Sequence, residues 1–112
     1  MTDPRASTSS VRGRTGTFQG HGGRVFWRSW LPGEEPRGVI GLVHGVGEHC
    51  GRYEHVGKRL ADSGFAVYAL DHIGHGRSDG ARGDIGSIGA AADNVVTLMD
   101  LASKPNPGRR TG

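Results

Sequence analysis

The stretch VIGLVHGVGEH, residues 39–49, decides the fold and begins the functional argument. Val39 to Val43 form a short apolar run without polar alternation, which is typical of a strand buried on both faces of a parallel sheet. The glycine-rich turn after it, residues 44–47, leads toward a predicted helix. A turn of this kind places backbone N–H groups at an exposed edge, where they can stabilise a developing negative charge.

The rest of the pattern predicts strands that alternate with helices. An aromatic and β-branched segment at 25–31 predicts a strand that forms a hairpin with a shorter one at 17–19. A helix over 52–63 precedes a buried strand over 65–70, and Ser87 is expected to cap a second helix that ends before Pro105. The order is a β-hairpin followed by β-α-β-α, which predicts an incomplete α/β domain with a parallel sheet.

Apolar residues at helical spacing predict which face of each helix is buried. In the first helix these are Tyr53, Val56 and Leu60; in the second they are Ile88, Ala92, Val95, Met99 and Ala102.

We expect one partial domain over residues 16–104, with disordered tails at 1–15 and 105–112. The formal net charge is +3, and several of the arginines and lysines fall in those two ends. Nucleic-acid binding requires basic side chains gathered on one folded surface, so the composition argues against a nucleic-acid partner.

The chain contains a single cysteine, Cys50, which excludes an internal disulfide framework. No secretory signal and no apolar run of membrane-spanning length is visible. These features predict a cytoplasmic protein without a transmembrane segment, whose contact with membranes, if any, is peripheral. The oligomeric state is left open.

A dinucleotide-binding site is one alternative interpretation of the turn. Gly45, Gly47 and Gly51 follow a strand, and Asp71 lies at the end of the next strand, as in a Rossmann fingerprint. Glu48, however, would stand where a pyrophosphate needs positive potential. The two strands that precede the motif also count against this interpretation.

A metal site is a second alternative, because His and Cys residues are numerous. Their spacing matches no established zinc motif, since the segment from His44 to His49 has one residue too many for H-x-x-E-H. We therefore predict no metal and no cofactor. The residues considered are His44, His49, Cys50, His55, His72 and His75.

Ser78 lies in the one G-x-S-x-G match of the chain, residues 76–80. A nucleophile elbow requires a strand that ends directly at the first glycine, but here the preceding strand ends near Asp71. All six histidines also precede Ser78, whereas the triad of an α/β-hydrolase runs Ser, Asp or Glu, then His. Ser78 is therefore predicted to be a loop residue, and no triad member is identified.

The stretch HGVGEHCGRYEHVGKRLADSGFAVYALDHIGHGRSDG, residues 44–80, resembles monoacylglycerol lipases and related lysophospholipases. These are serine hydrolases of the α/β-hydrolase fold, and the resemblance extends over about residues 16–103. It implies hydrolysis of a small lipid ester. By position, the backbone N–H of Val46 becomes one donor of the oxyanion hole, in a turn supported by His44, Gly45 and Gly47.

The resemblance also places Glu48 and Arg52 near the polar end of the substrate; a salt bridge that fixes the start of the helix is the alternative role. In the family, the nucleophile, acid, base and lid follow the second helix, and none of them is found in these residues. We therefore expect an N-terminal portion without activity of its own. The alternatives are a non-catalytic remnant and one half of a split enzyme. In either case the strand at 39–43 would be an open edge prone to aggregation.

Overall fold

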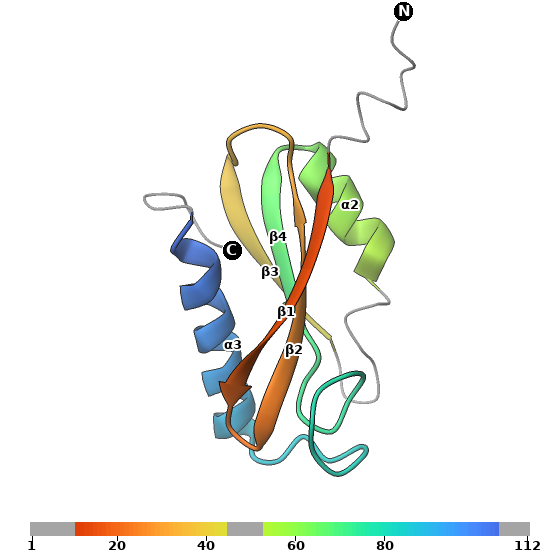
Figure 1. Cartoon of the computed structure of the whole chain (residues 1–112), viewed down its shortest axis with the longest axis vertical. Coiled ribbons are helices and arrows are strands. Elements are labelled where there is room, and N and C mark those ends of the chain that lie inside the picture. The colour runs from red at the N-terminus through yellow and green to blue at the C-terminus, as the bar shows by residue number, and fades with distance from the viewer. Residues whose placement is uncertain (1–10, 45–52, 106–112) are drawn as a thin grey trace, which may run out of the picture.

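The computed structural model describes residues 11–44 and 53–105 of the chain (Figure 1). The described elements confirm the predicted order of a hairpin followed by β-α-β-α. They are β1 (Arg12–Gly20), β2 (Gly23–Leu31), β3 (Gly38–Val43), α2 (Glu54–Asp62), β4 (Phe65–Leu70) and α3 (Ile88–Ser103).

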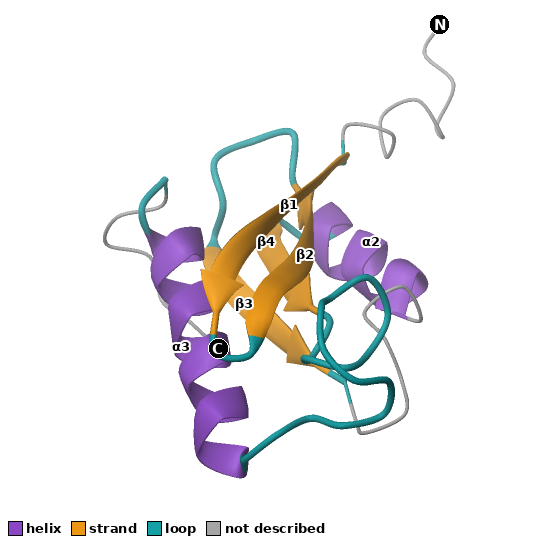
Figure 2. Cartoon of the chain, turned by 60° about the horizontal axis from the view of Figure 1, so that its bottom comes forward, coloured by secondary structure: helices purple, strands orange, loops and turns teal. Residues whose placement is uncertain are grey.

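The four strands form one sheet in the order β1-β2-β4-β3, with the two helices on opposite faces (Figure 2). β3 and β4 are parallel, while β1 pairs with β2 and β2 with β4 in antiparallel fashion. β4, the last strand among the described residues, therefore lies inside the sheet. The predicted α/β class is confirmed, and β3 and β4 supply its parallel part.

β4 is the centre of the hydrophobic core, because every residue from Ala66 to Leu70 is buried. Side chains alternate between the faces of a strand, so β4 contributes to two clusters. Leu98 and Ala102 of α3 belong to the first cluster, and Ala61 of α2 belongs to the second. Complete burial of a side chain such as Leu70 contributes about 1.5–3 kcal/mol. The β4 residues of the first cluster are Ala66, Tyr68 and Leu70, and those of the second are Val67 and Ala69.

β1 is longer than predicted and begins inside the segment that we expected to be a tail. Residues 12–15 pair with residues 28–31 of β2, so the prediction of a disordered tail is wrong for them. Arg12 and Arg14 are exposed on this strand, and their charge therefore belongs to the folded domain. The pairing was not visible in the sequence because backbone hydrogen bonds to β2, rather than apolar side chains, define this part of the ladder. Residues 1–10 and 106–112 lie outside the described part, and for them the predicted tails remain a prediction.

α2 buries a face that matches the predicted one only in part, since Leu60 packs against the second cluster as expected. Gly57 and Ala61 are buried, whereas Val56 is 45% exposed. A Cβ at position 57 would overlap the indole ring of Trp30. The helix therefore approaches β2 through a glycine, and apolar periodicity alone does not reveal such a contact.

α3 begins as predicted, because the side chain of Ser87 accepts a hydrogen bond from the backbone N–H of Ala90. The predicted apolar face is wrong at its N-terminal end, where Ile88 is 77% exposed. The buried positions are Ala91, Asn94, Leu98 and Ala102. The polar residue Asn94 is accommodated on this buried face because its side-chain oxygen accepts a hydrogen bond from the N–H of His21 in the β1–β2 turn.

β3 forms one edge of the described sheet and pairs there with β4 alone. A charged residue or a proline usually protects an edge strand from pairing with another chain. The sequence of β3, GVIGLV, contains neither. Val43 at its end is 50% exposed. Within the described residues, the predicted open edge is therefore present.

Candidate active site

The candidate site lies where the parallel strands β3 and β4 end side by side. Val43 is the register partner of Leu70, so His44 and Asp71 leave the sheet at the same edge. Parallel strands are the arrangement in which ligand sites form beyond the carboxyl ends. The topology therefore brings together the two segments that the sequence singled out.

The turn predicted to form the oxyanion hole follows His44 and lies outside the described residues. This applies to Val46 and its neighbours Gly45 and Gly47, and also to Glu48 and Arg52, so their roles remain predictions. His44 itself is described. It is 3% exposed, and its Nε2 accepts a hydrogen bond of 2.8 Å from the backbone N–H of His72.

Three histidines, His44, His72 and His75, form a buried cluster at this edge. From the sequence, all three are weighed as metal ligands, and His44 is also predicted to support the oxyanion turn. The ring centroids of His44 and His72 are 4.4 Å apart, and those of His44 and His75 are 5.5 Å apart. Burial lowers the pKa of His72 below its ordinary value of 6.5, and the neighbouring His44 lowers it further. The position of His72 therefore favours its neutral ring.

The described residues contain no group of three or more His, Cys, Asp or Glu side chains that could hold a metal ion. His49 and Cys50 lie outside the described part, whereas His55 is exposed on α2.

Asp71 organises the loop after β4. Its side chain is 2% exposed, and Oδ2 accepts the backbone N–H of Arg77 at 2.9 Å. Gly76, with a φ of 51°, passes so close that a Cβ there would overlap this carboxylate. The dinucleotide interpretation requires an acidic side chain that is free to bind the ribose of the ligand. The carboxylate of Asp71 is instead engaged by its own loop.

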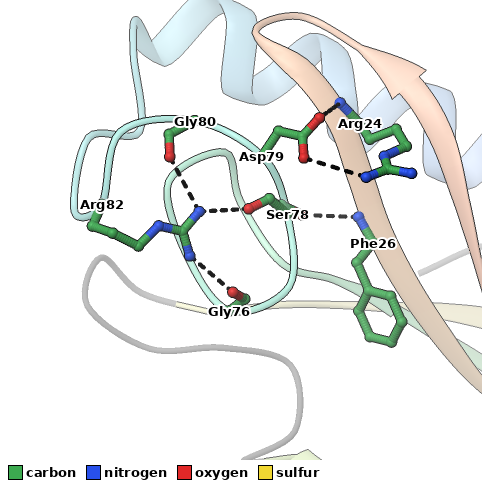
Figure 3. A network of polar contacts seen from close by, with 7 residues as sticks. All are labelled: Arg24, Phe26, Gly76, Ser78, Asp79, Gly80 and Arg82. Atoms are coloured by element: carbon green, nitrogen blue, oxygen red, sulfur yellow. Dashed lines mark hydrogen bonds and ion pairs between the residues drawn. The ribbon is translucent and has the colours of Figure 1, made fainter.

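Ser78 is a buried structural residue of this loop (Figure 3). Its hydroxyl donates to the carbonyl oxygen of Asp71 at 2.6 Å and accepts the backbone N–H of Phe26 at 2.8 Å. Both contacts tie the loop to the sheet, the second to β2. Ser78 is thus a loop residue, as predicted, and the absence of a nucleophilic role remains a prediction.

Two further side chains, those of Arg82 and Asp79, hold the same loop, as Figure 3 shows. The guanidinium of Arg82 donates to the carbonyl oxygens of Gly76, Ser78 and Gly80. Asp79 accepts the backbone N–H of Arg24 at 2.9 Å. These contacts could not be predicted from the sequence, because a guanidinium that binds backbone carbonyls has no characteristic spacing.

Glu54 at the start of α2 forms a polar contact that sequence reasoning missed. Its carboxylate accepts the indole N–H of Trp30 at 2.6 Å and lies 3.8 Å from the guanidinium of Arg28. The contact joins a helix to β2 across a long separation in the chain, so no local pattern announces it. It fixes the end of α2 that is nearest to the predicted oxyanion turn in the sequence.

Residues 34–111 match the family described as serine aminopeptidase, S33. The chain belongs to this family of α/β-hydrolases. It is 44% identical over 92 residues to the monoacylglycerol lipase of Mycolicibacterium smegmatis, a match that covers 81% of this chain and 33% of the lipase.

Two other relatives differ in how much of their length is matched. A thermostable carboxyl esterase from Bacillus coagulans superposes with a TM-score of 0.81 at 32% identity, over 88% of this chain and 34% of the esterase. Protein K6 of vaccinia virus is 38% identical over 65 residues, which cover 58% of this chain and 80% of the viral protein. The chain thus spans about a third of the length of the lipase and the esterase.

No helix in the described part of the chain is long and apolar enough to cross a membrane.

Proposed function

We propose that this chain forms the N-terminal part of a carboxylic-ester hydrolase that acts on monoacylglycerols or lysophospholipids. The observation that carries the proposal is the 44% identity to the monoacylglycerol lipase over 92 residues. The parallel ends of β3 and β4 support it, because they provide the edge at which such a site is built.

In the proposed reaction, a serine outside these residues attacks the ester carbonyl, and its proton passes to a histidine. The N–H of Val46 donates to the oxyanion that forms, which stabilises the transition state by about 3 kcal/mol. The alcohol leaves with the proton from the histidine, and water then hydrolyses the acyl-enzyme. Glu48 and Arg52 receive the polar end of the substrate in this proposal.

These residues alone are proposed to be inactive towards esters. Ser78 shares its hydroxyl with two backbone groups, and the sequence contains no histidine after it. A fluorophosphonate probe, which labels activated serines, should leave the 112-residue chain unmodified. Stoichiometric labelling of Ser78 would contradict this proposal.

A chimeric enzyme tests the role of Val46 directly. The N-terminal third of the Mycolicibacterium lipase is replaced by this chain, and hydrolysis of a monoacylglycerol is measured. Val46→Pro removes the N–H and should lower kcat about 10²–10³-fold, while Val46→Ala keeps the N–H and serves as the matched control. Equal rates for the two variants would eliminate Val46 as an oxyanion donor.

A non-catalytic module is the second candidate, favoured by the match to Protein K6, most of whose length is covered by this region. Mixing the chain with the C-terminal two thirds of the lipase separates the candidates. Recovered ester hydrolysis supports one half of a split enzyme, and an active chimera without recovery in the mixture supports the N-terminal part of a single chain. A folded but inactive chimera supports the non-catalytic module.

A further inference from the structure

Three buried histidines connect the ends of β3 and β4, and the proposed chemistry uses none of their rings. His44 follows β3 directly, while His72 and His75 lie in the segment after β4. Their side chains are 3%, 5% and 5% exposed. Histidine is the side chain whose ordinary pKa lies in the physiological range, so a buried group of three calls for an explanation.

The hydrogen bonds define the protonation state of two of these rings. Nε2 of His44 accepts the backbone N–H of His72, and a nitrogen can accept only while it carries no proton. Nδ1 of His75 lies 3.0 Å from the carbonyl oxygen of Ile73, so this nitrogen carries the proton and donates it. The His44 ring is therefore neutral, with its proton on Nδ1, and the His75 ring carries a proton on Nδ1.

A positive charge on one of these rings would be stabilised by few neighbouring groups. Nδ1 of His72 and Nε2 of His75 are buried and have no hydrogen-bond partner among the described residues. The titratable groups that face His72 from the described elements are His44 after β3, and His75 and Asp71 after β4. Asp71 is the one acid among them, and its carboxylate already accepts the N–H of Arg77. An uncompensated buried charge is strongly unfavourable.

We propose that His44, His72 and His75 form an acid-sensitive latch that holds the ends of β3 and β4 together while the rings are neutral. Protonation of His44 at Nε2 converts the acceptor of the inter-strand hydrogen bond into a donor, so the bond to the His72 N–H is lost. Protonation of His72 or His75 places a positive ring beside the other two. The proposal does not depend on the proposed ester hydrolysis, because it concerns contacts between described residues.

Nuclear magnetic resonance of the 112-residue chain with ¹⁵N-labelled histidine tests the latch between pH 7 and pH 5, the range in which histidine titrates. At pH 7 the His44 Nε2 signal should be that of an unprotonated acceptor. On acidification His72 should take up its proton only below pH 6.5, the ordinary pKa of histidine. Titration of His72 at or above pH 6.5 would overturn the proposal.

Hydrogen exchange of the His72 amide provides the second measurement. Its protection, corrected for the intrinsic exchange rate, should fall by up to about tenfold per pH unit for each proton taken up. The amide of Tyr68 inside β4 should keep its protection, which distinguishes local release from global unfolding. Unchanged protection of the His72 amide at pH 5 would contradict the latch.

Two variants complete the test. His44→Gln offers an acceptor near the position of Nε2 that does not titrate, so the His72 amide should remain protected at both pH values. His55→Gln is the matched control, an exposed histidine removed, and should retain the acid-induced loss. If His44→Gln does not fold, the wild-type titration and exchange still decide the question.

Discussion

Replacement of Ser78 by alanine should destabilise the protein strongly, although the position resembles a dispensable catalytic serine. Ser78 is 3% exposed, and its hydroxyl forms hydrogen bonds with two backbone groups at once. It donates to the carbonyl of Asp71 and accepts from the N–H of Phe26. Alanine leaves both without this partner.

The magnitude follows from the two buried groups that lose this hydroxyl as a partner. Loss of a partner costs a buried donor or acceptor about 1–3 kcal/mol, so two such losses predict a change of about 2–6 kcal/mol. Small domains are stable by about 5–15 kcal/mol in total. Ser78→Ala should therefore remove a large part of the free energy of unfolding.

Urea denaturation followed by tryptophan fluorescence measures this loss, because Trp30 is almost completely buried. Ser63→Ala is the matched control, since the Ser63 hydroxyl donates to the carbonyl of Arg59 on the exposed surface. A change within about 0.5 kcal/mol is expected for that control. An equally small change for Ser78→Ala would refute the assignment of Ser78 as the anchor of the loop.

Three other predictions concern packing, pH and association. Gly57→Ala should lower the free energy of unfolding by about 1–3 kcal/mol, because the new methyl group meets the Trp30 ring; Gly89→Ala, on the open side of α3, is the control and should not destabilise in urea denaturation. The pKa of His72 is lowered in the folded state, so the unfolded chain binds this proton more readily. The contribution of His72 to the free energy of unfolding is therefore complete above pH 6.5. Below pH 6.5 the free energy of unfolding falls by up to about 1.4 kcal/mol per pH unit. A free energy of unfolding that is constant from pH 7 to pH 5 would contradict this. Val43→Lys places a charge at the exposed end of β3 and should reduce light scattering of the concentrated chain without loss of stability; unchanged scattering would show that association does not use this edge.

The order of elements could be predicted from the sequence because each signal is local. The apolar runs at 39–43 and 65–70 match β3 and β4 closely, and the cap at Ser87 is a contact within four residues. These features depend on backbone conformation and on burial of both faces of a strand, which short segments encode. The family resemblance rested on residues 44–80, which follow β3 and include β4.

Contacts between distant elements could not be predicted in this way. The burial of Gly57 depends on the Trp30 ring, and that of Asn94 on the backbone of the β1–β2 turn. Residues 12–15 became a strand through pairing with β2. At the candidate site, the sequence placed His44 correctly at the end of a buried strand, but its hydrogen bond to His72 required the parallel register of β3 and β4.

The interior position of β4 has a consequence for the order in which the protein can fold during synthesis. The hairpin and β3 leave the ribosome first, but β2 pairs with β4 from Trp27 to Trp30, and β3 pairs with β4 along its length. Until residues 65–70 have emerged, the nascent chain therefore holds two apolar strand edges with no partner. Such intermediates expose surface that aggregates or recruits chaperones. The emergence of β4 is thus the event that converts separate segments into one sheet.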